Sequence, residues 1–130
     1  MAQARLTRAS PSFAVADVFA TAEHYRDRLG FHFDRVWGNP PSFVILDRDD
    51  ARVMLKQVAA DALPRPAESP SEEQYDMYLA ADDVTALADE LRERGATIIA
   101  GPIDRPIYNG RELLVRDCDG RILCFGQLLD

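Results

Sequence analysis

The chain has too few cysteines for a disulfide framework, because only Cys118 and Cys124 occur among its 130 residues. It also lacks any apolar run near the roughly 18 residues that a membrane-spanning helix needs. No apolar segment follows Arg5 and Arg8, as one would in a secretion signal. Basic residues are outnumbered 22 to 15 by acidic ones, which gives a formal net charge of −7. We therefore expect a cytoplasmic protein that binds neither nucleic acid nor membrane.

The sequence is built from two similar halves. In the first half, a strand-like segment at residues 12–16 leads to Asp17, which is suited to cap the helix that the following apolar spacing predicts. In the second half, the same order appears at residues 77–81, followed by Asp82 or Asp83. Placing Asp17 on Asp83 offsets the halves by 66 residues, and the apolar positions of the two helices then coincide.

Strand-like runs separated by turns follow each predicted helix. They lie at residues 31–37, 42–46 and 52–58 in the first half, and at 96–103, 112–115 and 121–125 in the second. The acidic turn at Asp47 matches the one at Asp117, and Gln57 matches Gln127, at an offset of 70. The sequence therefore predicts one α+β domain made of two βαβββ units, residues 8–58 and 74–130. The proline-rich, acidic residues 59–73 between them are predicted to form a linker.

Two motifs resemble a known superfamily, the vicinal oxygen chelate proteins, which include glyoxalases, dioxygenases and bleomycin-resistance proteins. The segment from Val15 to Phe31 resembles the family's aspartate followed by a Tyr-Arg-Asp-x-Leu-Gly-Phe run. The segment from Val115 to Leu123 resembles its Asp-Pro-Asp-Gly hairpin, with Cys118 in place of proline. Residues 108–112 resemble the loop before that hairpin. The resemblance implies curled mixed sheets around a central cavity, helices on the outside and a homodimer.

Metal-dependent members of that family hold a divalent ion with histidine or glutamate from four strands. Carried over by the resemblance, these positions fall on Ser10, Met54, Asp76 and Cys124. A hydroxyl, a thioether, a carboxylate and a thiol do not suit the octahedral sites of magnesium, manganese, nickel or iron. We therefore expect no metal and no other cofactor, although a soft ion held by the sulfur ligands and Asp76 remains an alternative.

Without a metal the sequence offers only a weak catalytic candidate. Asp76 would act as a general base if an apolar cavity raised its pKa, or it is a half-exposed carboxylate at the start of a strand. Whether the protein is an enzyme is left open at this point.

The predicted cavity combines small, apolar and aromatic side chains, which suits a planar or cationic small molecule. The candidate ligand-binding residues are Ser12, Trp37, Phe43, Met54, Asp76, Tyr78, Tyr108, Arg111 and Cys124. The same side chains would equally suit a packed core. Arg111 either pins an anionic group at the cavity mouth or pairs with Glu112 or Asp117.

Three functions fit these observations. The first is a metal-independent small-molecule-binding protein that resembles the bleomycin-resistance type, which sequesters antibiotics. The second is a superfamily enzyme (a lyase, an isomerase or a dioxygenase-like protein) that acts on a small polar metabolite. The third is an interaction module without a small-molecule ligand.

Overall fold

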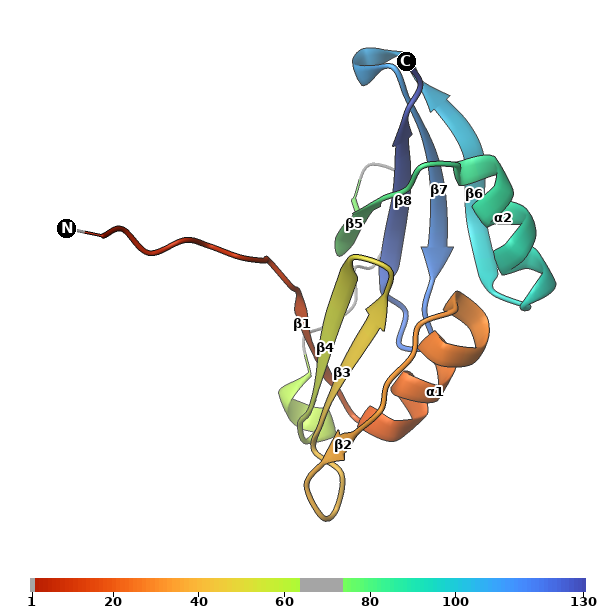
Figure 1. The fold of residues 1–130 in the computed structure, drawn as a ribbon. Helices are drawn as coiled ribbons and strands as arrows, with labels where there is room; N and C mark the ends of the chain where they lie inside the picture. Colours follow the sequence, from red (N-terminus) through yellow and green to blue (C-terminus); the bar gives the residue numbers. More distant parts are fainter. Residues whose placement is uncertain (1, 64–73) are drawn as a thin grey trace.

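The computed structural model of the chain describes residues 2–63 and 74–130 and confirms the α+β architecture with two βαβββ units (Figure 1). The first unit comprises β1 (Ser12–Val15), α1 (Val18–Leu29), β2 (Val36–Trp37), β3 (Phe43–Arg48) and β4 (Ala51–Gln57). The second comprises β5 (Met77–Ala80), α2 (Val84–Glu93), β6 (Thr97–Arg105), β7 (Gly110–Arg116) and β8 (Ile122–Leu128). Short 3-10 helices lie at Ala60–Ala62 and Pro106–Tyr108.

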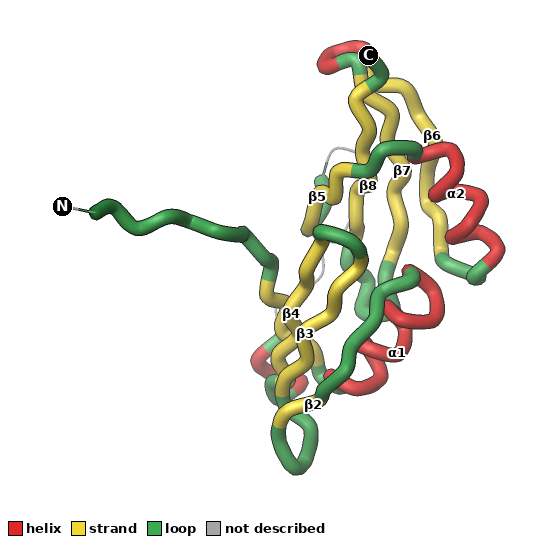
Figure 2. Tube along the Cα trace, viewed as in Figure 1, coloured by secondary structure: helices red, strands yellow, loops and turns green. Residues whose placement is uncertain are grey.

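Each unit forms a four-stranded mixed sheet with the same topology. The strand orders are β1-β4-β3-β2 and β5-β8-β7-β6, and in each sheet only the first and last strands of the unit pair in parallel. Figure 2 shows both helices on the same side of the two sheets. Within residues 2–63 and 74–130, no α-helix covers the opposite face of either sheet, which we call the helix-free face.

The second strand of the first unit is much shorter than predicted. The sequence predicts a strand over residues 31–37, but the structure has only Val36–Trp37, with an isolated bridge from His32 to Asp47. Between these points Phe33 packs edge-to-face on Phe19 of α1, with ring centroids 6.2 Å apart. This contact with the helix accounts for the departure of the chain from β3.

The predicted helix caps are confirmed in both units. The Asp17 carboxylate accepts a hydrogen bond from the Ala20 N–H at 3.0 Å, and the Asp83 carboxylate accepts one from the Ala86 N–H at 2.9 Å. The repeated glutamine has the same role twice, because Gln57 accepts from the first N–H of α1 and Gln127 from the first N–H of α2. Each helix thus begins with two of its four free N–H groups satisfied by side chains.

A single hydrophobic core lies between the helices and the sheets and extends through both units. On β1, Phe13 and Val15 are buried in it while Ser12 is exposed, as the two-residue period of a strand requires. The units also join through a buried polar contact, in which the Tyr25 hydroxyl donates to Asp117 at 2.7 Å. Burial and the adjacent Asp117 raise the pKa of Tyr25 well above 10.0, so this hydroxyl stays protonated.

None of the helices in the described part of the chain is both long enough and apolar enough to span a membrane. The predicted linker, residues 59–73, is only partly described: Ala60–Ala62 forms a 3-10 turn, and residues 64–73 lie outside the described residues.

Candidate functional site

The sheet register decides which predicted residues share a face. Ser12 of β1 lies opposite Met54 of β4, and Tyr78 of β5 lies opposite Cys124 of β8. Residues that lie opposite each other in neighbouring strands point to the same side of the sheet. Met54 and Cys124 are absent from the core on the helix side, so these four positions belong to the helix-free faces.

Two positions inferred from the family resemblance lie outside the strands. Ser10 precedes β1, and Asp76 precedes β5. Asp76 is exposed, and its carboxylate accepts a hydrogen bond from the Ile122 N–H at 2.9 Å. This bond joins the start of β5 to the start of β8, which is a structural role. Its surroundings do not supply the apolar cavity that the general-base hypothesis requires. In the sheets, the residue opposite Met54 of β4 is Ser12 and not Ser10. The residue opposite Cys124 of β8 is Tyr78 and not Asp76.

These positions do not fit a hard divalent ion. Ser12, Met54, Tyr78 and Cys124 offer two hydroxyls, a thioether and a thiol, where such ions take carboxylate and imidazole. Burial, followed by the nearby Glu112 carboxylate, raises the pKa of Cys124 to about 12, so the sulfur is a protonated thiol at neutral pH. Across residues 2–63 and 74–130, no three histidine, cysteine, aspartate or glutamate side chains lie close enough together to hold a metal ion.

The helix-free face of the second sheet carries a cluster of tyrosines around one buried carboxylate. Glu112 of β7 is buried, and one of its oxygens accepts a hydrogen bond from the Tyr108 hydroxyl at 2.8 Å. The hydroxyls of Tyr78 and Tyr108 are 3.4 Å apart. Because Tyr108 already donates its hydrogen to Glu112, Tyr78 is the donor in this longer contact. The rings of Tyr75 and Tyr78 lie with centroids 5.9 Å apart. We call Tyr75, Tyr78 and Tyr108 the tyrosine cluster.

Two glycines make room for the tyrosine rings against the sheet. A Cβ atom built on Gly126 would overlap the ring of Tyr78, and one built on Gly110 would overlap the ring of Tyr108. Both glycines are buried in the sheet. Any larger residue at either position would displace the ring above it, because a Cβ atom cannot approach another heavy atom so closely.

An arginine balances the buried carboxylate. Arg105 donates from its Nε to the second oxygen of Glu112 at 2.9 Å, and both side chains are largely buried. Burial, with smaller contributions from Tyr78 and Glu112, raises the pKa of Tyr108 above any physiological value. The Tyr108 hydroxyl therefore stays protonated and donates to a carboxylate that is also paired with Arg105. Glu112 holds the Tyr108 ring directly, and Tyr78 and Tyr75 follow by contact with Tyr108 and with each other.

The first sheet carries a smaller aromatic pair on its helix-free face. The rings of Trp37 and Phe43 have centroids 5.5 Å apart, and the Arg35 guanidinium lies 4.9 Å from the Trp37 ring centroid. Met54, partly buried, and Ser12, exposed, lie on the neighbouring strands of the same sheet. The sequence-predicted residues are thus divided between two faces, one on each unit.

Arg111 lies apart from both aromatic surfaces. It precedes Glu112 on β7 and therefore points to the other side of the sheet. There its Nε donates to Asp104 at 2.7 Å, and it approaches the Thr85 hydroxyl of α2 at 3.5 Å. Its partner is thus neither Glu112 nor Asp117, and its position does not support the prediction that it binds a ligand.

Sequence reasoning did not identify Tyr75, Arg105 or Glu112 as site residues. One signal was available for Glu112, since it is a charged residue within a strand whose following residues, Leu113 to Val115, are all buried. A charge in such a strand usually has a partner. The partner, Arg105, follows from the pairing of β6 with β7, which the local pattern does not specify.

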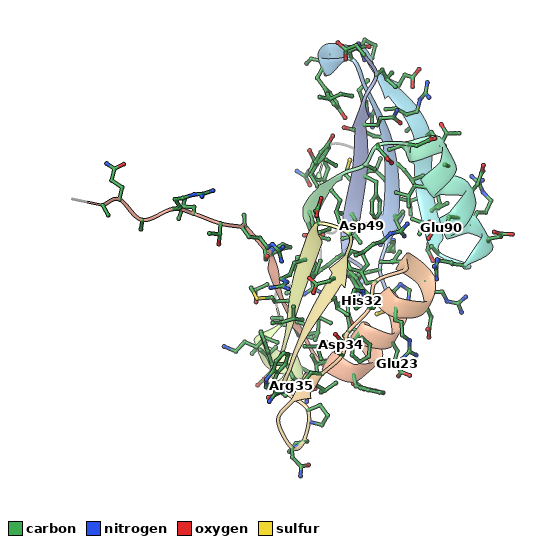
Figure 3. The ribbon with its side chains drawn as sticks, viewed as in Figure 1. Glu23, His32, Asp34, Arg35, Asp49 and Glu90 are labelled. Atoms are coloured by element: carbon green, nitrogen blue, oxygen red, sulfur yellow. The ribbon has the colours of Figure 1, made fainter. Side chains whose placement is uncertain are left out.

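A separate groove of about 720 Å³ lies between the two units. Its walls are the turn between β3 and β4 (residues 48–52), β5 with the residues that follow it (77–83), and the adjacent side of α2. Figure 3 labels Asp49 on the first of these walls and Glu90 on the last. Of the predicted ligand-binding residues, only Tyr78 contributes to its lining.

Comparison with known proteins identifies a family and several structural neighbours. Residues 6–125 match the model described as the Glyoxalase/Bleomycin resistance protein/Dioxygenase superfamily. No curated protein matches the sequence.

The structural neighbours share the fold at low sequence identity. TioX from Micromonospora sp. ML1 has a TM-score of 0.73 at 19% identity, over 95% of this chain and 99% of that one. TnmS3, an antibiotic binding protein from Streptomyces sp. CB03234, has a TM-score of 0.71 at 22% identity, over 98% and 100%. A glyoxalase/bleomycin resistance protein/dioxygenase from Nocardioides has a TM-score of 0.68 at 20% identity, over 99% and 87%.

Proposed function

We propose that this chain, which belongs to the Glyoxalase/Bleomycin resistance protein/Dioxygenase superfamily, is a homodimeric binding protein that sequesters a planar small molecule without using a metal ion. The ligand lies on the tyrosine cluster of the second sheet. The carrying observation is that Tyr75 and Tyr78, whose rings lie close together, are 42% and 41% exposed.

Exposed aromatic rings in one place favour binding because they lose unfavourable contact with water when a ligand covers them. Phenol rings stack with planar ligands and attract cations through their faces. Glu112 does not attract the ligand directly, since both of its oxygens already accept hydrogen bonds. The preference for a planar, and in particular a cationic, ligand therefore rests on the rings and on the net charge of −7.

The chemistry of the same face favours binding over catalysis. Cys124 is fully buried and its raised pKa keeps it protonated, so it is a poor nucleophile. The donors at the four family positions do not suit a Lewis-acidic ion. The antibiotic binding protein TnmS3 shares the fold, which is consistent with a binding role for this chain.

A second copy completes the site in this proposal. The Trp37–Phe43 pair on the helix-free face of the first sheet is a further aromatic surface. In the homodimer, the Trp37–Phe43 pair of one protomer lies across the ligand from the tyrosine cluster of its partner. Two facing aromatic surfaces would hold a planar molecule more tightly than one.

A fluorescence titration with proflavine, a planar cation, tests the proposal. Trp37 is the only tryptophan of the chain, so quenching of its emission reports ligand at the first-sheet face. We expect saturable quenching and a raised melting temperature with proflavine, and smaller changes with the planar anion fluorescein. Tyr78→Ala should weaken proflavine binding at least tenfold.

Phe19→Ala is the matched control, because Phe19 is similarly exposed but lies on α1. Equal loss of binding in the two variants would contradict a site on the tyrosine cluster. Elemental analysis of the same preparation addresses the metal, and a stoichiometric divalent ion would overturn metal-independent binding.

A further inference from the structure

A chain of hydrogen bonds runs outward from the buried carboxylate of the second sheet. Glu112 accepts from the Arg105 Nε at 2.9 Å and from the Tyr108 hydroxyl at 2.8 Å, and the hydroxyls of Tyr108 and Tyr78 are 3.4 Å apart. We call these four side chains the hydrogen-bond relay. Because Glu112 is 7% exposed and Tyr78 is 41% exposed, the relay connects the buried sheet face to the surface.

The carboxylate sets the direction of every hydrogen bond in the relay. Glu112 is paired with Arg105, and an ionised carboxylate can only accept, so the Tyr108 hydrogen points inward. Burial raises the pKa of Tyr108, so the hydroxyl keeps this hydrogen. The Tyr108 oxygen then accepts from Tyr78, whose hydrogen points inward as well. The Tyr78 oxygen therefore presents lone pairs to a molecule that approaches from outside.

The strands beneath the relay hold these hydroxyls in place. A Cβ atom at Gly126 would overlap the Tyr78 hydroxyl, and one at Gly110 would overlap the Tyr108 hydroxyl, so both lie directly on the sheet backbone. Hydrogen bonds in series polarise one another, which strengthens the outermost oxygen as an acceptor. Tyr78 is also one of the two exposed rings on which the ligand is proposed to lie. A substituent of a ligand stacked on that ring can therefore reach a fixed acceptor.

We infer that the planar ligand carries an amine or hydroxyl hydrogen that it donates to the Tyr78 oxygen. Glu112 and Tyr108 are positioning residues, because they hold the Tyr78 hydrogen away from the ligand. A planar molecule whose substituents can only accept would place one acceptor against another and bind more weakly. This inference rests on the proposed function, since it concerns the ligand of the same face.

Two dyes with the same ring system test this selection. Proflavine carries primary amines, whereas acridine orange is the same planar cation with those amines fully methylated, so that their N–H donors are lost. The anisotropy of each dye's own fluorescence gives its Kd. The readout is the ratio of the two Kd values in each variant relative to the unchanged protein, because a loss of stacking weakens both dyes alike.

Tyr78→Phe keeps the ring and removes the acceptor. It should shift the ratio about fivefold in favour of acridine orange, which corresponds to one net hydrogen bond. Tyr75→Phe is the matched control, because it removes a hydroxyl from the neighbouring exposed ring, outside the relay. This control should leave the ratio unchanged.

Glu112→Gln tests the direction of the relay. An arginine has only donors, so the new amide turns its oxygen to Arg105 and its N–H donors to Tyr108. The Tyr108 hydrogen then turns to Tyr78, and the Tyr78 hydrogen turns outward. The ratio should shift in the same direction as in Tyr78→Phe, although every ring is retained. An unchanged ratio in the folded variant would overturn the positioning role, and Tyr78→Phe decides the inference even if Glu112→Gln does not fold.

The remaining outcomes separate this inference from the proposed function. Saturable binding of both dyes, with a ratio that Tyr78→Phe does not change, would overturn the donor requirement and leave the planar-ligand proposal standing. An equal shift in Tyr75→Phe would also overturn it, because the selection would not depend on the relay. If neither dye bound the unchanged protein, both proposals would be wrong.

Discussion

The two units have the same framework and different helix-free faces. Asp17 with Gln57 and Asp83 with Gln127 cap the two helices with near-identical hydrogen bonds. On the helix-free faces the equivalent positions differ: Tyr78 lies opposite Cys124 where the first unit has Ser12 opposite Met54. Backbone N–H groups at a helix start impose the same demand in both copies, whereas no such shared demand acts on the helix-free sheet faces.

The acidic turns of the two units show the same divergence on the helix side. Asp117 is buried and accepts hydrogen bonds from the Tyr25 hydroxyl and from two backbone N–H groups. Its counterpart Asp47 forms an ion pair with Arg52 in which both side chains are partly exposed. Asp117 therefore connects the two units, whereas Asp47 pairs within its own unit.

The largest effect is expected from removing that connection. Asp117→Ala leaves the buried Tyr25 hydroxyl and two N–H groups without their acceptor, and we expect it to lower the free energy of unfolding by about 3 kcal/mol or more. Asp47→Ala removes a partly exposed ion pair and should cost about 1 kcal/mol or less. Urea denaturation of both variants measures the difference. Similar losses would show that the two turns contribute alike.

The helix caps should respond equally in the two units. Gln57→Ala and Gln127→Ala each remove the acceptor of the first helical N–H, which costs about 1 kcal/mol in typical caps. Gln74→Ala, at an exposed position, serves as the control and should change stability little. If one cap variant lost at least twice as much free energy of unfolding as the other in the same urea assay, the two caps would not be equivalent.

Ligand binding on the proposed face of the second sheet should depend on the position of the Tyr78 ring. Gly126→Ala places a methyl group where the Tyr78 ring lies, so the ring must move and proflavine affinity should fall about tenfold, or about 1.4 kcal/mol. Thr97→Ala, exposed on β6, is the control and should bind normally. Unchanged affinity in Gly126→Ala would mean that the position of the Tyr78 ring does not matter for binding.

The smallest effects concern pH, at two helix positions that correspond at the offset of 66. Burial lowers the pKa of His24 from 6.5, and the charge of Arg28 lowers it further. The carboxylates of Asp117, Asp119 and Asp27 act in the opposite direction but are outweighed. Because the folded state resists protonation, stability should be full above pH 6.5 and fall as the pH decreases below that value. His24→Gln should flatten this slope.

Glu90 occupies the matching position, and its pKa is also lowered, but by pairing with arginines and not by burial. Its hydrogen bond from Arg48, followed by that from Arg94, lowers its pKa from 4.5. Its contribution should therefore be full above pH 4.5 and be lost as the pH falls through the lower folded value. Stability measured from pH 8 to pH 3 should show a shallow slope near 6 that His24→Gln removes, and a second one below 4.5 that Glu90→Gln removes. A single slope unaffected by either variant would refute the assignment.

Much of the framework could be predicted from local pattern. The repeat, the capping aspartates and the paired glutamines are visible in the sequence because each depends on neighbouring residues or on one internal match. The short β2 could not be predicted, since the contact of Phe33 with Phe19 competes with strand pairing. The direction of Arg111 was likewise open until the register of β7 placed it beside Asp104.

The sequence by itself determined the two-unit architecture, the side of β1 that faces the helices, and the poor fit of the family positions to a hard metal ion. The tertiary structure decided what surrounds Glu112, which glycines support the tyrosine rings, and that a charged groove separates the units. The physical reason is distance along the chain. Caps and periodicity act within a few residues, whereas Tyr78 with Gly126 and Arg48 with Glu90 meet only after both sheets have formed.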